Sequence, residues 1–445
     1  MSFSYTSSLI LKVAFRNVRR NWRHSLAALC TLAIGFVALS LFQGYIEELL
    51  RMQLDLIYSR IMIGEVMVQK PGAETREARI DPEAYWIDQK EQAFLEGWIA
   101  AHPNDVKTRV RMLMLLGMAH SGGSSAQAIA LGHDIPEGRI ARRKWVWNTY
   151  AGHPIRDDEP QSAILGTGLG TLLGCEMVQK DVPIDPKTSA PTAVERPLAC
   201  KQPTITLTVQ SGKGRTNAME AEVTGLTRAG ARDFNDRLLW VPLSFAQELA
   251  TTKNLSSYMI VLRNPADAPR LRADLRAAVK QAGLTLDVLD WFDSRGADLL
   301  RRGVELLSIF RALVFAVILV IAGTAVLTSM MKTVRERTRE IGTLRSIGYL
   351  RRHLLSMFAA EAAMLALLSG GIGFAVSVLV TAFVNQAGFL YRGGLLAEAI
   401  PLRIGYSTHA YVSGFLFLSF VAIIAALLAA NRVTRMRIAE SLSDS

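Results

Sequence analysis

Four long stretches of this sequence contain no charged residue. They cover residues 26–45, 312–331, 362–391 and 404–431. A helix needs about 20 apolar residues to cross a hydrocarbon core about 30 Å thick, and each stretch reaches that length. Core helices of soluble proteins rarely run so far without a charge, so we interpret all four stretches as membrane-spanning helices. The first is too long for the apolar part of a cleaved signal peptide, and we expect it to stay in the membrane.

The charged residues are concentrated beside these stretches. Residues 1–25, 332–353 and 432–445 together carry fifteen Lys/Arg and four Asp/Glu, which equals the net charge of +11 of the whole chain. Residues 46–305 carry 32 basic and 33 acidic residues. Because positively charged loops stay in the cytoplasm, we predict cytoplasmic termini and an extracytoplasmic region 46–305. A basic excess placed this way serves topology and contacts with anionic membrane lipid, and it argues against nucleic acid as a partner.

The predicted fold is an α-helical membrane protein with four transmembrane helices and a large α+β extracytoplasmic domain inserted between helices 1 and 2. Within that domain, residues 203–209 alternate polar and apolar side chains as a half-buried strand does. Residues 109–120 look extended and precede a Ser-Gly-Gly turn, whereas 82–101 and 267–282 look helical. The predicted segments are a cytoplasmic amphipathic elbow helix (1–25), transmembrane helix 1 (26–45), the periplasmic core domain with stalk ends (46–305), transmembrane helix 2 (306–331), a cytoplasmic coupling-helix loop (332–353), transmembrane helix 3 (354–391), a short periplasmic loop (392–403), transmembrane helix 4 (404–431) and a cytoplasmic tail (432–445).

Two of the three cysteines lie at the ends of an irregular, proline-containing segment, residues 175–202. Disulfides persist outside the cytoplasm, and closing a loop of about 25 residues adds roughly 3 kcal/mol of stability. We therefore predict a disulfide between Cys175 and Cys200. The alternative is a pair of unpaired, partly buried thiols.

No catalytic or nucleotide-binding motif is present in the sequence of the 46–305 region. Its histidines are not at metal-ligand spacing, and neither G-x-S-x-G nor H-E-x-x-H occurs. The Ser211-Gly-Lys213 segment is not a P-loop, because the position that requires the first glycine is Leu207. We therefore expect a non-enzymatic chain without a catalytic residue, metal or cofactor of its own. ATP and Mg²⁺ would be bound by a partner.

Residues 332–353, between the second and third stretches, carry seven Lys/Arg and two Glu. In residues 332–353, Val334, Ile341, Leu344 and Ile347 can share one face of a helix. A short charged helix between two spans suits a cytoplasmic partner, although a solvated loop that only sets topology would look similar. In the third stretch, Gly370, Gly371 and Gly373 allow either close helix approach or a plain kink. Glu361 is an ionisable group near the inner end of that span, where headgroup contact or pairing with a neighbouring Arg is expected.

This loop resembles the coupling-helix signature E-R-x-x-E-I-G-x-L-R-A-x-G of the FtsX/MacB/LolC-LolE permease superfamily, the type VII ABC transporters. Residues 335–348 read RERTREIGTLRSIG, with Ser346 where Ala is usual. Three further segments are similar to landmarks of the family. They are AFRNVRRN at 14–21, ILGTGLGTLLG at 164–174, and Asp236 followed by LWVPL at 239–243.

The resemblance implies mechanotransmission, in which a cytoplasmic ABC ATPase dimer docks on the coupling helix and drives movement of the periplasmic domains. It also implies a second permease copy, identical or related, and a location in the bacterial inner membrane. A periplasmic adaptor or a lipoprotein carrier is a further possible partner. The residues expected to bind the ATPase are Arg337, Glu340, Ile341, Gly342, Leu344, Arg345 and Gly348. Among them, Ile341 and Leu344 are the expected apolar anchors.

The function implied by the resemblance has several forms. Lipoprotein release to an outer-membrane carrier is the sharper reading, and export of periplasmic peptides, antibiotics or toxins is the next. An FtsX-like regulatory subunit, which activates a periplasmic cell-wall hydrolase without moving a substrate, is the alternative from another class. Its outer domain is usually smaller than the 46–305 region.

Overall fold

The structure is a computed structural model that describes residues 22–179, 181–185, 190–210, 215–228, 232–391 and 400–434. Most of the predicted elbow helix (1–25) and of the C-terminal tail (432–445) lies outside these residues. The chain divides into two compact units. The helical unit comprises 1–50, 303–390 and 401–445, and the α+β unit comprises 51–302 and 391–400.

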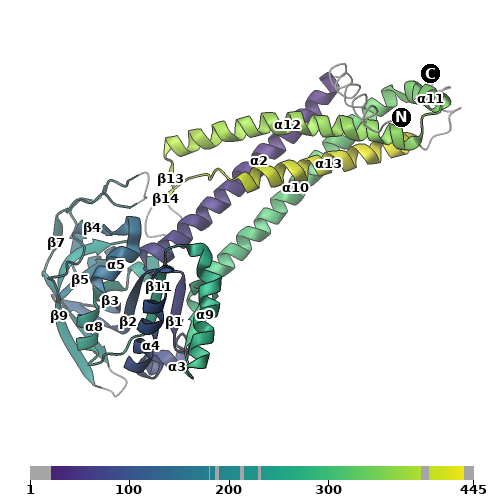
Figure 1. The fold of residues 1–445 in the computed structure, drawn as a ribbon. Coiled ribbons are helices and arrows are strands. Elements are labelled where there is room, and N and C mark those ends of the chain that lie inside the picture. Colours follow the sequence, from purple (N-terminus) through teal and green to yellow (C-terminus); the bar gives the residue numbers. More distant parts are fainter. Residues whose placement is uncertain are drawn as a thin grey trace. The chain divides into compact units, whose positions relative to one another are not determined.

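The helical unit contains four helices that are long and apolar enough to cross a membrane (Figure 1). These are α2 (Trp22–Asp55), α10 (Asp298–Glu336), α12 (Arg351–Ala387) and α13 (Thr408–Thr434). A short helix, α11 (Thr338–Ser346), joins α10 to α12. The first two long helices extend beyond the uncharged stretches, since α2 continues ten residues past Tyr45 and α10 begins at Asp298. The fourth begins at Thr408 rather than at residue 404, and Ile400–Pro401 (β14) pairs instead with Leu390–Tyr391 (β13).

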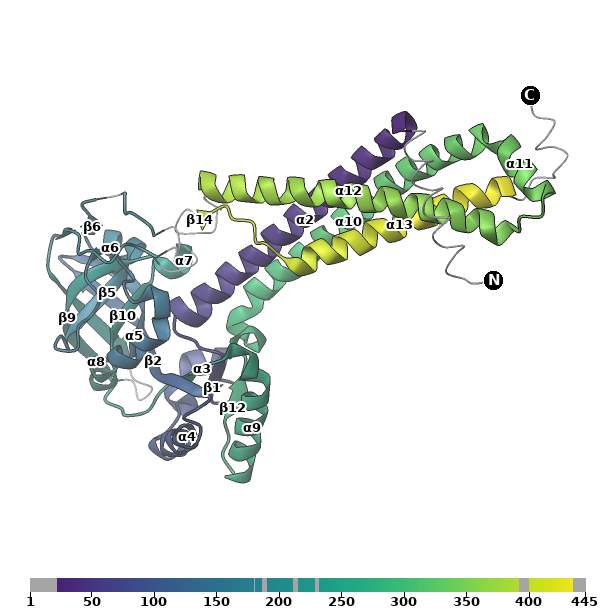
Figure 2. The same cartoon turned by 45° about the horizontal axis from the view of Figure 1, so that its top comes forward.

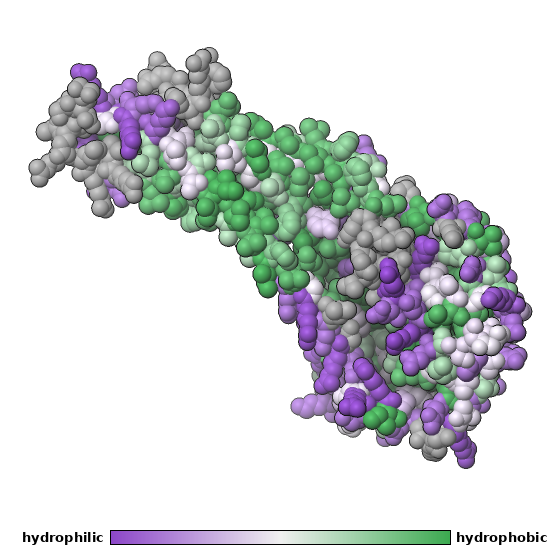
Figure 3. All heavy atoms as spheres, turned by 180° about the vertical axis from the view of Figure 1, so that it is seen from behind, coloured by the Kyte–Doolittle hydropathy of each residue, from purple (hydrophilic) through white to green (hydrophobic). Residues whose placement is uncertain are grey.

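Apolar stripes hold the four helices together. The stripes repeat every three to four residues, which is the spacing of one helix face. They are Ala28, Leu32, Phe36 and Leu39 on α2; Ala322, Val326 and Met330 on α10; Ala362, Leu365 and Ala366 on α12; and Leu418, Ala422, Ala425, Ala426 and Ala429 on α13. Away from the stripes the helices expose apolar side chains, which form the hydrophobic band in Figure 3. Hydrophilic residues of this unit gather at the end that carries α11.

Two of the three glycines in the third helix are sites of close helix approach. A Cβ at Gly370 would lie 2.6 Å from Cδ2 of Phe415, and one at Gly373 would lie 2.9 Å from Cδ1 of Phe36. No neighbour lies within 4 Å of a Cβ built at Gly371. Helix α12 is continuous over Arg351–Ala387, so the close-approach interpretation holds for Gly370 and Gly373.

The α+β unit is built on a ten-stranded mixed sheet of order β12-β1-β11-β2-β3-β10-β5-β9-β4, with β8 paired to β2 and β9. Its strands are β1 (Val66–Gln69), β2 (Val106–Ser121), β3 (Ser124–His133), β4 (Thr149–Gly152), β5 (Ser162–Gly166), β8 (Thr204–Gln210), β9 (Thr216–Thr227), β10 (Leu238–Pro242), β11 (Ser257–Leu262) and β12 (Asp287–Leu289). Its helices are α3 (Arg76–Ile80), α4 (Gln89–Ala101), α5 (Ile135–Arg142), α6 (Thr167–Leu172), α7 (Arg232–Asn235), α8 (Leu243–Leu249) and α9 (Ala268–Gln281). One-turn segments lie at Leu56–Arg60, Pro82–Tyr85, Arg143–Trp145, Pro265–Asp267, Trp291–Asp293 and Arg295–Ala297.

The central strands are buried on both faces. In β10, Leu239 and Val241 belong to one apolar core, while Leu238 and Trp240 belong to the other. Successive side chains of a strand point to opposite faces, so a run without polar residues fills two cores. The strand predicted at 203–209 is observed as β8, and 109–120 lies within β2, which turns into β3 through Gly122 and Gly123 with φ of +54° and +87°.

The helix expected over 82–101 is interrupted. A 3₁₀ turn covers Pro82–Tyr85, and α4 starts only after Asp88. Between them, Ile87 exchanges two backbone hydrogen bonds with Leu255, with N–O distances of 2.7 and 3.1 Å. Asp88 and Glu91 then form a capping box at the start of α4. Backbone pairing with a distant segment therefore replaces the helical bonds that the local pattern predicts.

Cys175 and Cys200 form a disulfide in the α+β unit. They are opposite each other in a small antiparallel pair, β6 (Cys175–Met177) and β7 (Leu198–Cys200), with a Cα–Cα distance of 4.0 Å. The bond therefore closes the 175–202 segment at its base.

Two of the sequence landmarks of the α+β unit meet in space. The turn from β5 into α6 contains Gly166 and Gly168, and these glycines lie against Asn235 and Asp236 at the end of α7. A Cβ at Gly168 would collide with the carboxylate of Asp236, and one at Gly166 with the carbonyl of Asn235. The glycines of this motif are therefore explained by tight packing, not by ligand binding.

Candidate functional site

Helix α11 follows α10 with a single residue, Arg337, between them (Figure 2). Its other end is closed by Gly348, whose φ of +103° suits glycine. The N–H of Gly348 donates to the carbonyl of Arg345 (3.1 Å), and the N–H of Tyr349 donates to the carbonyl of Leu344 (3.0 Å). These two bonds make a Schellman cap. Gly348, a member of the predicted docking set, is therefore explained by its role in ending the helix.

Three residues of the predicted docking set face the protein's own helices. Ile341 is 5% exposed and packs with Val334, Leu354 and Phe358 in a small apolar cluster, which we call the α11 cluster. Gly342 beside it is buried as well. Arg337 is buried and is paired with Glu361 of α12. In this structure Ile341 is therefore an internal packing residue, which differs from the expected role of an apolar anchor for a partner.

The outward side of α11 carries Glu340 and Gly348, which are exposed, and Arg345, which is half-buried. Leu344 is half-buried too, but it packs against the α11 cluster. Arg339 and Thr343 are exposed beside them. This side is polar and carries charges of both signs.

An exposed apolar surface adjoins α11 at the turn into α12. Ile347 is 72% exposed, Tyr349 45% and Leu350 51%. We call these three side chains the apolar turn. Their exposure places anchor-type residues directly after the helix, outside the docking set predicted from the sequence. The sequence feature that could have identified them is a group of three large apolar residues around Gly348, the glycine that ends the helix.

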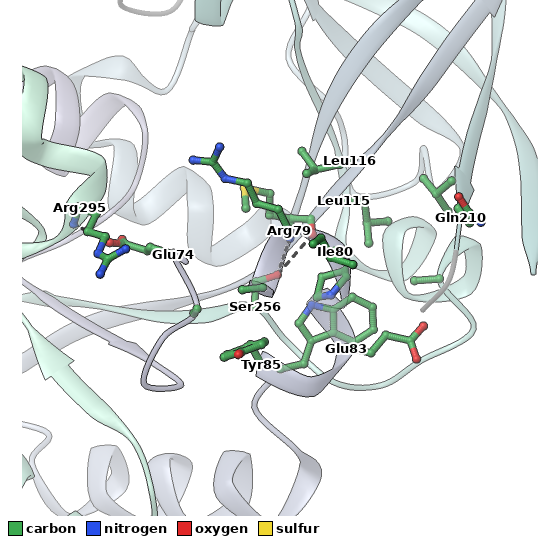
Figure 4. Close-up of a pocket in the computed structure, with 17 residues that line it drawn as sticks. Glu74, Arg79, Ile80, Glu83, Tyr85, Leu115, Leu116, Gln210, Ser256 and Arg295 are labelled. Atoms are coloured by element: carbon green, nitrogen blue, oxygen red, sulfur yellow. Dashed lines mark hydrogen bonds between the residues drawn. The ribbon is translucent and has the colours of Figure 1, made fainter. Parts of the chain in front are cut away.

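The described residues contain no group of three or more His, Cys, Asp or Glu that could hold a metal ion. A hollow in the α+β unit has a volume of about 750 Å³ and is shown in Figure 4. Ile80, Tyr85, Leu115 and Leu116 supply apolar surface there, and Arg79 and Glu83 supply charge. A hollow with apolar walls and a few charged groups suits binding of an apolar or amphiphilic molecule.

Comparisons with known proteins identify a family model and several relatives that parts of this chain resemble. Residues 312–438 match the family described as FtsX-like permease C-terminal. The chain is 28% identical over 202 residues to the macrolide export ATP-binding/permease protein MacB of Bdellovibrio bacteriovorus, covering 44% of this chain and 30% of that protein. It is 34% identical over 111 residues to the pyoverdine export ATP-binding/permease protein PvdT of Pseudomonas entomophila, covering 25% of this chain and 16% of that protein. The matched part thus spans less than a third of each of these two relatives.

Two solved structures are similar to the chain as well. They are the periplasmic region of MacB from Actinobacillus actinomycetemcomitans (11% identity, TM-score 0.33, 55% of this chain and 94% of that one) and the extracellular domain of the ABC-type transporter YknZ (12% identity, TM-score 0.31, 50% and 98%). Residues 312–438, which contain α11, α12, α13 and most of α10, are thus similar to the C-terminal part of FtsX-like permeases.

Proposed function

We propose that this chain is the membrane subunit of an ABC transporter, which couples ATP hydrolysis by a separate cytoplasmic ATPase to movement of its α+β unit in the periplasm. The observation that carries the proposal is the apolar turn (Ile347, Tyr349, Leu350) beside the charged face of α11. Apolar anchors surrounded by polar residues are typical of protein interfaces. The ATP-binding domains named in the relatives' descriptions suggest an ATPase as the partner.

The proposed orientation follows from charge. The segment that contains α11 is strongly basic, and the α+β unit contains nearly all of the near-neutral region between the first two helices. Positively charged segments stay in the cytoplasm, so α11 would face the ATPase and the α+β unit would lie outside. ATP-driven movement of α11 would reach the α+β unit through α2 and α10, which continue into that unit beyond the helical bundle.

The substrate class that fits best is an apolar or amphiphilic molecule on the periplasmic side. The hollow near Ile80 and Leu116 offers apolar surface of a suitable size, about 750 Å³. Lipoprotein release and export of small apolar compounds both use such substrates. Copurification with a lipoprotein would favour the first, and protection of cells against an apolar compound would favour the second.

The test uses the full chain co-expressed with the ABC ATPase subunit encoded nearest to it. We expect the two to copurify and the ATPase rate to rise in the complex. Ile347→Asp should weaken the complex by about 30-fold or more in Kd, as loss of an interface hot spot does. Leu172→Asp is the matched control, because Leu172 is exposed as well (57%) but lies in the α+β unit and does not line the hollow. An ATPase that neither binds nor responds to the unaltered chain contradicts the proposal.

A further inference from the structure

We propose that Arg337 and Glu361 form a positioning pair that fixes α11 to the third long helix, so that force applied to α11 moves α10 and α12 together. The inference rests on the proposed function for the source of that force. The pair itself is a feature of the helical unit. Its role differs from the docking role expected for Arg337, because the guanidinium is directed into the protein.

The geometry places Arg337 at a joint. Its N–H donates to the carbonyl of Val334 in α10 (3.2 Å), and its carbonyl accepts from the N–H of Ile341 in α11 (2.9 Å). Its side chain reaches a third helix, with Nη1 3.8 Å from Oε2 of Glu361 in α12. One residue therefore contacts the end of one span, the start of α11 and the body of the next span.

Because both side chains are buried, the ion pair between Arg337 and Glu361 is sensitive to the positions of the helices that carry them. The side chains of Arg337 and Glu361 are 8% and 3% exposed. Nε and Nη2 of Arg337 are buried without a hydrogen-bond partner among the described residues. A buried ion pair gives little net stability compared with apolar residues of the same size, yet separating its members is costly because each leaves an uncompensated charge. Such a pair therefore favours one fixed arrangement of the helices that carry it.

Apolar packing encloses the pair. Leu354 and Phe358 lie seven and three residues before Glu361 on the same face of α12, and Val334 and Ile341 pack against them. The α11 cluster also includes Ala430 of α13. A partner that docks on the exposed side of α11 would not reach the pair. Arg337 and Glu361 would thus act after docking, by transmitting movement instead of binding the ATPase.

The experiment separates docking from transmission. The full chain and its ATPase are reconstituted in lipid nanodiscs with Glu361→Gln, with Arg337→Met, or with both Arg337→Met and Glu361→Met. The double variant removes both buried charges, so it should fold without the ion pair that joins α11 to α12. We expect it to capture the ATPase within about twofold of the unaltered chain but to lose about tenfold of the permease-dependent stimulation of ATP hydrolysis. Arg311→Met, at an exposed arginine of α10, is the matched control and should change neither quantity.

A second measurement does not depend on the ATPase. A nitroxide label at Thr343, an exposed position of α11, should become more mobile in the double variant than in the unaltered chain. Unchanged label mobility, or a double variant with full stimulation, overturns the positioning role. Loss of capture in a well-folded double variant also overturns it, since Arg337 would then act in docking. If the unaltered chain does not bind the ATPase, the proposed function fails, and the label alone decides on the pair.

Discussion

The aromatic ring of Phe415 in α13 packs directly on the backbone of Gly370 in α12. A Cβ at Gly370 would lie 2.6 Å from Cδ2 and 2.9 Å from Cε2 of that ring. Atoms cannot approach this closely, so any side chain at Gly370 would push the two helices apart. The absence of a side chain therefore sets the spacing of the third and fourth long helices.

Gly370→Val should destabilise the helical unit by about 1–3 kcal/mol, the usual cost of overpacking. Gly371→Val is the matched control, because a Cβ at Gly371 has no neighbour within 4 Å. The measurement is the thermal midpoint of the purified chain in detergent. Equal midpoints for the two variants would contradict the proposed role of Gly370 in helix spacing.

The disulfide between Cys175 and Cys200 should stabilise the α+β unit. Its closed loop, with a sequence separation of 25, corresponds to about 3 kcal/mol. Cys200→Ser should therefore lower the urea midpoint of this unit, followed by tryptophan fluorescence. Six of the seven tryptophans lie in the α+β unit, so the signal reports mainly on it. Cys30→Ser, at the cysteine outside the bond, is the control, and an equal loss in both variants would count against the disulfide's contribution.

Acid should destabilise the α+β unit through His133. Burial holds the pKa of this imidazole well below its usual value, and the positive charge of Arg142 lowers it further. Above about pH 7 the imidazole is neutral in the folded and the unfolded chain. Below the unfolded pKa of about 6.5, only the unfolded chain takes up the proton, so stability falls by up to about 1.4 kcal/mol per pH unit.

The test compares His133→Gln with the unaltered chain. Between pH 7 and pH 5 the variant should lose about 2 kcal/mol less stability, because glutamine does not titrate. His120→Gln, at a partly exposed histidine of the same sheet, is the control for general effects of removing an imidazole. Urea unfolding at both pH values gives the comparison. An unchanged acid dependence in His133→Gln would show that other groups are responsible.

The features that could be predicted best from the sequence are those that depend on local composition. The uncharged stretches located the four long helices, since a bilayer requires such stretches whatever the tertiary structure. The alternation at residues 203–209 located β8 for the same kind of reason. The break of the helix at Ile87 could not be predicted, because it depends on backbone bonds to Leu255, 168 residues away along the chain.

The candidate site shows the same limit. The loop motif indicated a short charged helix, and α11 is that helix. Which residues of α11 face a partner depends on how α12 and α13 pack against it. The sequence of the loop alone does not determine that packing. The burial of Arg337 and Ile341 thus required the structure, as did the exposure of Ile347.

The two isoleucines of this segment should respond in opposite ways to the same substitution. Ile341→Ala removes buried methyl groups from the α11 cluster and should destabilise the chain by about 2–4 kcal/mol. Ile347→Ala, at a side chain that is 72% exposed, should change stability by less than about 0.5 kcal/mol. Binding of the ATPase should show the reverse order once protein amounts are equalised, with the larger loss for Ile347→Ala. A stable Ile341→Ala variant that fails to bind the ATPase would restore Ile341 as the docking anchor, because its effect would then arise at the interface and not in the protein's own packing.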